Sequence, residues 1–477
     1  MVTMTRRTMM QAGLAAAAAR NPLRGWAQGA EISGGRPPVA ERRFRSPAIE
    51  AAIGATRKRI ADPMLAAMFE RCFPNTLDTT VYLGTWGGKA DTFVVTGDID
   101  ALWLRDSSAQ VWPYLRFAKE DPQLSTLLEG LVRRQARMVL LDPYANAFTR
   151  NATDAPLKWA AHDKTEMRPG VAERKWEVDS LCYVLRLAHG YWRATGDRGV
   201  FDAQWKAAAK KIVDTFKTQQ RIDVRGPYSF ERMSMAPYDT VPLDGFGNPA
   251  RPVGMIFSMF RPSDDACIYP FLIPSNLFAV RALGQLKELA EQVLGDGKLA
   301  SACAKLAAQV RTALDQYGKC RHPRYGEILA YETDGYGNAL MMDDANAPSL
   351  LSLPYLGASD VRDALYQRTR QFVLSSANPY FFKGSAAQGV GGPHVGLGQI
   401  WPLGIILRAL TSTDDAEIAT CLRWLRDTTA GSGFMHESFD ANDPRKFTRP
   451  WFAWANTLFG ELVLKVADER PALLGSV

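Results

Sequence analysis

The spacing of apolar residues limits the fold of this chain more than any other feature of its sequence. Ten stretches between residues 108 and 468 repeat apolar side chains at intervals of three and four, as Leu277, Val280 and Leu283 do. This spacing is typical of amphipathic α-helices, each of which buries one face against a neighbour. Strand-like segments are short and few, at residues 81–83, 93–95 and 328–331. The sequence therefore predicts an all-α fold with long loops.

The predicted helices cover nearly the whole chain, and Ser275 is expected to cap one of them. They span residues 108–119, 124–141, 179–195, 199–219, 275–294, 299–317, 359–374, 398–410, 414–428 and 451–468. A ring of about twelve helices in two layers, the (α/α)6 toroid, holds this number in one domain. Helix count alone does not separate such a ring from a superhelix or from two bundles. No internal repeat of about 30–50 residues is visible, which weighs against a superhelix.

Residues 1–30 have the composition of an export signal. Arg6 and Arg7 precede a mildly apolar, Ala-rich stretch that is too short to span a bilayer. The arginine pair resembles a twin-arginine signal and predicts a periplasmic or secreted protein, whereas the alternative is an ordinary basic N-terminus. Residues 31–45, rich in Gly, Pro and Arg, are predicted to be a linker, and residues 46–470 a single domain. No other stretch has about 18 uninterrupted apolar residues, so no membrane span is expected.

Charge and residue usage exclude several classes of function. The formal net charge is +7, but residues 1–30 hold four arginines and no acid, which leaves 7 − 4 = +3 for the rest. Basic residues do not cluster with aromatics, so no nucleic-acid partner is expected. Five histidines and six cysteines are dispersed without metal-ligand spacing, and nucleotide-binding glycine motifs are absent. We expect no metal and no cofactor, and we expect the cysteines to be buried free thiols.

Two loops combine acids with aromatic or basic residues in the way that sugar-binding sites require. Residues 96–108 contain three aspartates with Trp103 and Arg105; carboxylates and Arg bind adjacent hydroxyls, and an aromatic ring covers the apolar face of a sugar. The alternative is that Asp106 or Ser107 only caps the helix and that Arg105 pairs locally. In the second loop, repulsion between Asp264 and Asp265 raises the pKa of the less solvated carboxyl, as a general acid requires. Helix capping at Ser263 is the alternative there.

Two further loops have the same character. Residues 391–402 combine glycines with His394 and a tryptophan, and either line a ligand or form a glycine-rich turn around a buried ring. Residues 433–456 place Glu437 between aromatic residues and beside His436, in a segment too polar for a core and too aromatic for a solvated loop. Glu437 is therefore a candidate for activating water. Trp451 and Trp454 lie three residues apart and form either a sugar platform or part of the core.

At these loops the chain resembles the α-1,6-mannosidases of glycoside hydrolase family 125. The resemblance runs in order from about residue 76 to 466 and is carried by GDIDALWLRDSSAQVWPYL, KWEVDSLCY, FRPSDDACIYPFLIPSN, MDDANAPSLLSLPYLG and GFMHESFDANDPRKFTRPWFAWANTLFGEL. It implies an (α/α)6 toroid that releases terminal α-1,6-linked mannose with inversion and without a metal. The implied partner is a mannose-containing oligosaccharide or glycan, and a monomer or weak homo-oligomer is expected.

The same resemblance assigns roles to individual residues. The double-aspartate loop supplies the general acid, for which we take Asp264, with Asp265 as the alternative, and Glu437 is the general base. Terminal mannose is bound by residues spread over all four loops and the KWEVDSLCY stretch: Trp103, Arg105, Asp106, Asp179, His394, His436, Arg449 and Trp451. Two other functions stay open, a toroid glycosidase acting on α-glucosides and a mannoside-binding protein without catalytic activity.

Overall fold

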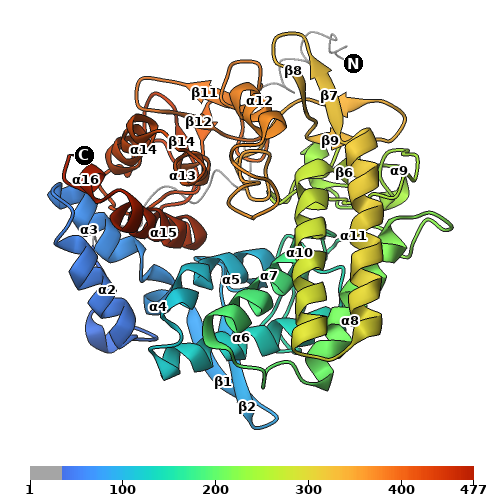
Figure 1. Ribbon diagram of the computed structural model, residues 1–477, viewed down its shortest axis with the longest axis horizontal. Helices are drawn as coiled ribbons and strands as arrows, with labels where there is room; N and C mark the ends of the chain where they lie inside the picture. The colour runs from blue at the N-terminus through green and yellow to red at the C-terminus, as the bar shows by residue number, and fades with distance from the viewer. Residues whose placement is uncertain (1–34, 477) are drawn as a thin grey trace, which may run out of the picture.

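The computed structural model describes residues 35–476, which fold into a ring of helices. Figure 1 shows the ring closing where α2 and α3 lie beside the C-terminal α15 and α16. The α-helices are α2 (Pro47–Arg57), α3 (Pro63–Cys72), α4 (Asn75–Thr79), α5 (Leu104–Val111), α6 (Pro122–Leu141), α7 (Val178–Thr195), α8 (Ala203–Gln219), α9 (Pro242–Gly245), α10 (Ile273–Gln292), α11 (Gly297–Tyr317), α12 (Ala364–Val373), α13 (Pro402–Leu410), α14 (Asp415–Asp427), α15 (Ala453–Glu469) and α16 (Pro471–Leu474).

The helices form two concentric layers. The inner layer contains α5, α7, α10, α13 and α15, and α15 packs against both α13 and α5 to close it. The turn-rich residues 349–357 take the remaining inner position. Tyr183 of α7 donates to the carbonyl of Ala347, just before this segment (3.1 Å), and Tyr366 of α12 donates to the carbonyl of Leu351 within it (2.9 Å). The outer layer contains α2 with α3, α6, α8, α11, α12 and α14. This arrangement is the predicted (α/α)6 toroid.

Outer and inner helices begin in different ways. Each outer helix starts behind a side chain that accepts a backbone N–H of the first turn, the usual device for satisfying these donors; these residues are Ser46, Asp62, Asp121, Asp202, Asp296, Asp363 and Asp414. None of the five inner helices has a side-chain cap, and their N-cap residues are Trp103, Glu177, Leu272, Trp401 and Phe452. The first N–H groups of the inner layer are therefore not occupied by capping side chains.

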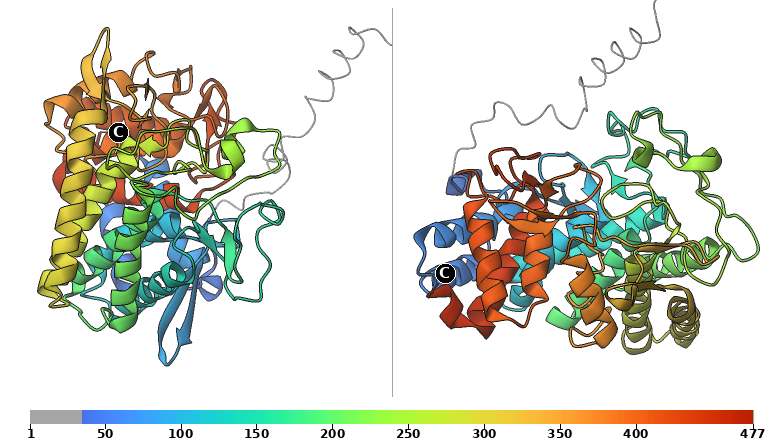
Figure 2. Two further views of the ribbon diagram at one scale, coloured as in Figure 1. Left: turned by 90° about the vertical axis from the view of Figure 1, so that its right-hand side faces the viewer. Right: turned by 90° about the horizontal axis from the view of Figure 1, so that it is seen from above.

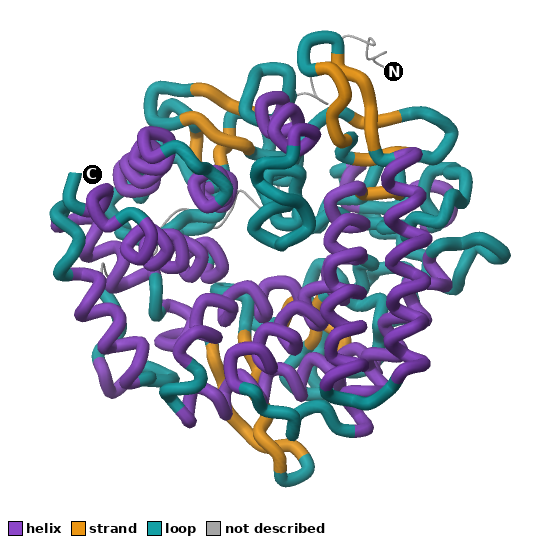
Figure 3. The backbone as a smooth tube through the Cα atoms, in the orientation of Figure 1, coloured by secondary structure: helices purple, strands orange, loops and turns teal. Residues whose placement is uncertain are grey.

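The strands are short and lie in the connections between helices, as Figure 3 shows. They are β1 (Val81–Trp86), β2 (Lys89–Val94), β3 (Leu102–Trp103), β4 (Ala147–Phe148), β5 (Val171–Glu173), β6 (Phe271–Leu272), β7 (Lys319–His322), β8 (Gly326–Leu329), β9 (Glu332–Thr333), β10 (Ala339–Leu340), β11 (Phe381–Lys383), β12 (Gln388–Val390), β13 (Gln399–Ile400) and β14 (Phe439–Asp440). All pair antiparallel, in the orders β1-β2, β3-β4-β5, β10-β9-β6, β7-β8, β11-β12 and β13-β14. Three of these pairings fix the chain just before α5, α10 and α13.

The ten predicted helices are all present, although their bounds differ. The first predicted helix begins earlier, at Leu104, and continues as a 3-10 helix, Trp112–Phe117. Helices α2 and α3 were missed. Ser275 is not an N-cap, because α10 begins two residues before it and its hydroxyl donates to Asp179 instead (3.4 Å). Asp106 and Ser263 do not cap a helix either: Asp106 lies in the first turn of α5, and Ser263 precedes no helix.

The N-terminal predictions lie partly outside the described residues. The proposed signal, residues 1–30, is not described, and the proposed linker is described only from residue 35. Within that part, Arg36 lies against the helical domain and pairs with Glu50 (2.7 Å) and Asp78 (2.8 Å). No helix among residues 35–476 is both long and apolar enough to cross a membrane. All six cysteines are free, and four of them are buried.

Candidate active site

The N-terminal ends of the inner helices bring the predicted loops together. Loop 96–103 leads into α5, the double-aspartate loop precedes α10, and residues 391–401 lead into α13. Pairing of β13 with β14, Ile400 opposite Phe439, holds the Glu437 loop against the His394 loop. Acidic side chains gather where helix dipoles are positive, which stabilises their charged forms.

Arg105, in the first turn of α5, is the centre of a buried ionic cluster. Its Nη1 donates to Oε2 of Glu177 at 2.6 Å and lies 3.5 Å from Oδ2 of Asp179. Its Nε lies 3.5 Å from Asp106, and its Nη2 lies 3.6 Å from Oδ1 of Asp264. One guanidinium thus faces four carboxyl groups, so the cluster cannot hold every carboxyl ionised without strong repulsion.

Burial keeps protons on part of this cluster. It raises the pKa of Asp106 to about 6 against the opposing charge of Arg105, and it raises the pKa of Asp179 to about 6 in the same way. Burial raises the pKa of Glu177 well above its ordinary value, and the charges of Asp179 and Asp264 add to the rise. Glu177 is therefore the carboxyl of the cluster that holds a proton most firmly.

Asp264 and Asp265 occupy different environments although they are adjacent. Asp264 has a left-handed backbone (φ 67°), and its side chain is 27% exposed. Its Oδ1 accepts from Asn146 (3.3 Å), and its carbonyl accepts from Lys175 (2.7 Å). Burial opposes the charge of Asp264, but Arg105 and Lys175 outweigh burial and hold its pKa below the usual range. A strained backbone of this kind is typical of functional residues.

Asp265 is turned inward, with a side chain only 1% exposed. Its Oδ1 lies 2.9 Å from Nδ1 of His394. Burial of the imidazole opposes its charge, yet Asp265, through its charge and hydrogen bond, and further Glu437 and Asp264, raise the pKa of His394 to about 9. His394 is therefore protonated at neutral pH, and the charges of the acid loop and of Glu437 meet at its ring.

Glu437 is held by the residues that follow it in the chain. The Thr448 hydroxyl donates to its Oε2 at 2.8 Å, and Nη1 of Arg449 lies 3.4 Å from its Oε1. Arg449 also pairs with Asp98 and donates to the carbonyl of Thr96 (3.4 Å), which joins the Glu437 loop to the loop before α5. Both carboxylate oxygens of Glu437 thus have fixed partners, and its orientation is determined.

Two of the remaining predicted residues, Trp103 and His436, are buried. Trp103 is only 4% exposed and belongs to a small apolar cluster with Ala101, Ala147 and Ala172. His436 is buried, stacks on Phe447 (4.0 Å between ring centroids) and has Nδ1 2.9 Å from the carbonyl of Pro450.

Burial also lowers the pKa of His436 and favours its neutral form. Its contacts brace the Glu437 loop. Trp451 precedes α15, is half-buried and packs against the core beside Phe452, whereas Trp454 is fully buried in the core.

The sequence did not single out several residues that complete this cluster. Glu177 and Lys175 lie inside the KWEVDSLCY stretch, of which only Asp179 was predicted to be a site residue. The two additional charges among apolar residues could have indicated that they belong to the site as well. Asn146 contacts Asp264, Glu173 and Glu177 from the loop after α6. No feature of its local sequence distinguishes that asparagine from a turn residue. Within residues 35–476, no group of three or more His, Cys, Asp or Glu is arranged as a metal site.

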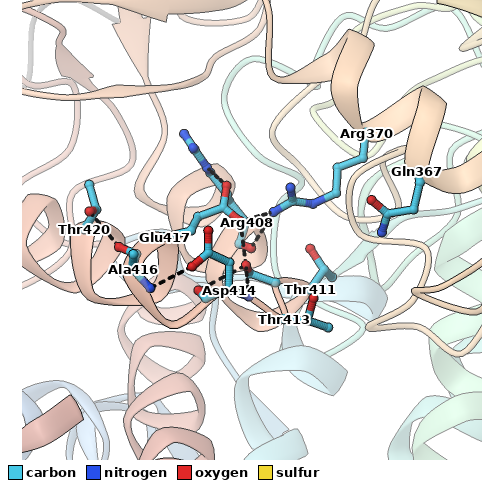
Figure 4. A pocket seen from close by; sticks show the side chains of 10 residues that line it. Gln367, Arg370, Arg408, Thr411, Thr413, Asp414, Ala416, Glu417 and Thr420 are labelled. Atoms are coloured by element: carbon cyan, nitrogen blue, oxygen red, sulfur yellow. Dashed lines mark hydrogen bonds and ion pairs between the residues drawn. The ribbon is translucent and has the colours of Figure 1, made fainter.

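Two cavities lie elsewhere in the ring. The larger, about 1010 Å³, lies at the opposite end of the inner helices and is lined by Trp112, Arg186 and Glu461 among others. The smaller, about 490 Å³, is drawn in Figure 4, where Arg370 and Arg408 both contact Glu417 (2.6 and 2.7 Å). Neither cavity is lined by the acidic residues of the candidate site.

Comparison with known families identifies the protein class. The family model of metal-independent α-mannosidases, glycoside hydrolase family 125, matches residues 62–464. The chain belongs to this family. This family 125 chain is therefore a glycoside hydrolase that acts on α-mannosides, and the family and toroid expected from the sequence are confirmed.

Two relatives align with nearly the whole mannosidase. The meiotically up-regulated gene 157 protein of Schizosaccharomyces pombe is 41% identical over 455 residues, which cover 92% of this chain and 89% of that protein. A solved metal-independent α-mannosidase of Streptococcus pneumoniae, in a non-productive complex with α-1,6-mannobiose, is 41% identical with a TM-score of 0.86. That alignment covers 90% of this chain and 100% of the other. A solved wild-type glycosidase, 14% identical with a TM-score of 0.50 over 89% of this chain and 98% of its own, shares the fold.

Proposed function

We propose that this α-mannosidase releases terminal α-1,6-linked mannose from non-reducing ends and inverts the anomeric carbon. The linkage is supported by the pneumococcal relative, which was solved with α-1,6-mannobiose. The observation that carries the mechanism is the meeting of the two carboxylate loops at the His394 loop: Asp265 lies 2.9 Å from the His394 ring, and β13 pairs with β14 beside Glu437. These loops precede α10 and α15, which occupy opposite positions in the inner ring.

Asp264 is proposed as the general acid. It is the more exposed of the two adjacent aspartates, whereas Asp265 is bound to His394. The low pKa of Asp264 places the proton of the cluster on Glu177 in the free enzyme, and Arg105 touches both carboxyls. The two carboxyls act as one coupled acid. The proton passes from Glu177 to Asp264 and from there to the departing glycosidic oxygen as the bond to the anomeric carbon breaks.

Glu437 is proposed as the general base. It removes a proton from a water molecule while the water oxygen attacks the anomeric carbon from the face opposite the leaving group. An inverting enzyme keeps its two carboxyls roughly 6.5–9.5 Å apart to admit this water. Thr448 binds one oxygen of the Glu437 carboxylate and Arg449 binds the other, which fixes the orientation of the group.

The other site residues are proposed to bind the terminal mannose. Asp106 and Asp179 are deeply buried beside Arg105, and His394 and Arg449 carry positive charge between the acid and base loops. Charged partners of this kind make strong, directional hydrogen bonds to adjacent hydroxyls. Trp103, His436 and Trp451 are proposed only as a second layer behind these groups, because of their burial. We propose that the Arg105 cluster forms the closed end of the site, as an exo-acting enzyme requires.

Hydrolysis of α-1,6-mannobiose, followed by NMR, tests the proposal. We expect β-mannose to appear first, with an equal rate in the presence of EDTA, and we expect α-glucosides to be inert. Glu437→Gln keeps the size of the side chain but removes the base, and should lower kcat by several orders of magnitude while mannobiose still binds. Initial release of α-mannose, or a near-normal rate in this variant, would contradict the mechanism. A protein that binds mannobiose without cleaving it would be a mannoside-binding protein.

Export is a separate proposal that rests on residues 1–30 alone. We propose that the paired arginines direct the chain out of the cytoplasm. Fractionation of cells that produce the wild-type chain and the Arg6→Lys/Arg7→Lys variant tests this. Equal distribution of both proteins between the fractions would contradict it.

A further inference from the structure

Trp159 is an exposed aromatic residue that is nevertheless fixed in place. Its side chain is 48% exposed, and its indole N–H donates to Oε1 of Glu173 at 3.0 Å. Trp159 and Trp86 are the large exposed tryptophans of residues 35–476. Exposure of an indole ring is costly unless a partner covers it. A rigidly held, solvent-facing ring is therefore a candidate binding surface.

Three hydrogen bonds in series connect Trp159 to the proposed acid, and the first is the bond to Glu173. Oε2 of Glu173 accepts from the side-chain amide of Asn146 at 3.1 Å, and the same amide nitrogen lies 3.3 Å from Oδ1 of Asp264. Glu173 is itself completely buried and belongs to β5, which pairs with β4 beside the start of α5. The indole is thus attached, through Glu173 and Asn146, to the frame that positions the carboxyl group of Asp264.

The loop that carries Trp159 is braced by a second loop. Arg232 contacts Oε1 of Glu173, the oxygen that also accepts from Trp159, at 2.9 Å, and it pairs with Asp163 at 2.7 Å. Backbone hydrogen bonds between Lys164 and Glu231 join the two loops directly (2.8 and 3.2 Å). Figure 2 shows both loops, 149–170 and 221–247, projecting from the same face of the ring. The wall formed by these two loops lies beside the acid loop, because the backbone N–H of Ala266 donates to the carbonyl of Tyr238 at 2.7 Å.

The chemistry of the acid decides which part of a substrate reaches this wall. A general acid protonates the glycosidic oxygen, so the sugar that leaves lies on the side of the acid, away from the terminal mannose. We propose that Trp159 is the platform for the leaving mannosyl residues of an α-1,6-mannoside, stacking on the apolar C–H face of a pyranose ring. This inference rests on the proposed function. It also replaces the role that the sequence suggested for Trp103, whose ring is buried.

Trp159→Ala, assayed on substrates with different leaving groups, tests the inference. The substrates are α-1,6-mannobiose and α-1,6-mannotriose, whose leaving groups are sugars, and α-mannosyl fluoride, whose leaving group is a single atom. We expect kcat/KM to fall roughly tenfold on both oligosaccharides, the size of a lost aromatic contact, and to stay unchanged on the fluoride. Trp159→Phe keeps an aromatic face but loses the hydrogen bond to Glu173, and should recover most of the activity.

Trp86→Ala is the matched control. Trp86 is 63% exposed, but it lies at the tip of the β1–β2 hairpin, where Arg137 covers its ring. We expect this variant to match the wild type on all three substrates. Equal loss on the fluoride and the oligosaccharides in Trp159→Ala would mean that Trp159 acts through the fold or the acid, and would overturn the inference, as would unchanged kinetics on every substrate. A wild type that cleaves the fluoride but no mannoside would overturn the proposed linkage, and this platform with it.

Discussion

The His394–Asp265 pair gives a titration that the structure predicts in both position and size. Asp265 is buried and accepts from the ring of His394 at 2.9 Å, and Glu437 and Asp264 add their charges. Although burial alone would lower it, the pKa of His394 rises from 6.5 to about 9. This difference corresponds to about 3 kcal/mol of interaction that favours the charged ring. Replacing Asp265 by Asn removes the largest favourable part while keeping the shape of the pair.

NMR of ring-labelled histidine measures this pKa directly, because the chain has only five histidines. We expect one resonance to titrate near pH 9, to vanish in His394→Gln and to move toward 6.5 in Asp265→Asn. Because the pKa is raised in the folded state, the stabilisation is fully present below pH 6.5 and is lost as pH rises through 9. The wild type should therefore lose stability between these values, and Asp265→Asn should lose less.

Two results would refute this reasoning. If every histidine resonance titrates below pH 8, the ring of His394 is not held charged by its carboxylate neighbours. If a resonance near pH 9 remains in Asp265→Asn, the charge of His394 depends on Glu437 and Asp264 rather than on the pair. Mannobiose hydrolysis over the same pH range adds a functional measure, since activity should decline above pH 9 in the wild type as the positive charge between the acid and base loops is lost.

Three further predictions concern single substitutions. Asp264→Asn should lower kcat on mannobiose by about 10²–10⁴ but preserve cleavage of α-mannosyl fluoride, which needs no acid; equal losses would reassign the acid. Arg105→Met should lower stability by about 3–5 kcal/mol, because buried carboxyls lose their cation, and a melting temperature unchanged at pH 7 would contradict this. Gly384→Ala places a Cβ 2.1 Å from the carbonyl of Ala441 and should lower the melting temperature by several degrees, whereas Gly284→Ala, with nothing within 4 Å, should not; equal melting temperatures would contradict the clash.

Helix periodicity predicted most of the fold because toroid helices are amphipathic and long. The ten predicted stretches match helices of the structure, including α6 and α11, whose buried residues recur at helical spacing. Helices α2 and α3 were not predicted, although they are no shorter than α12 and α13, which were. The turn-rich residues 349–357 show the opposite case, an inner position filled without a regular helix, which no periodicity analysis detects.

The candidate site was harder to predict because its residues are brought together by the ring. Glu437 and the double aspartate were found from their unusual local composition, but composition does not say which neighbour is buried. Asp265 and His394 pair across 129 positions of the chain, so the different environments of Asp264 and Asp265 appear only in three dimensions. Trp103 was chosen as a sugar platform because it is aromatic and close to acids, yet its ring is buried in a small apolar cluster apart from the main core. Trp159 has the exposed ring instead, but its neighbours in the sequence are less distinctive than those of Trp103.

The contrast between capped and uncapped helices explains how the ring tolerates so many acids in one place. At each outer helix a Ser or Asp side chain accepts N–H groups of the first turn, as Asp121 does at α6. At the inner helices the N-cap positions carry large apolar residues or Glu177, whose side chain binds Arg105 and caps nothing. Five uncapped N-termini therefore direct N–H groups and positive dipole ends toward one centre. A capping Asp there would satisfy those donors but add a charge to a cluster in which burial already raises the pKa values of Asp106, Asp179 and Glu177. Neutral acceptors instead take the first N–H groups of α5, α7 and α10, namely the carbonyl of Asn146, the hydroxyl of Ser258 and the carbonyl of Tyr331, so no further charge is added to the cluster.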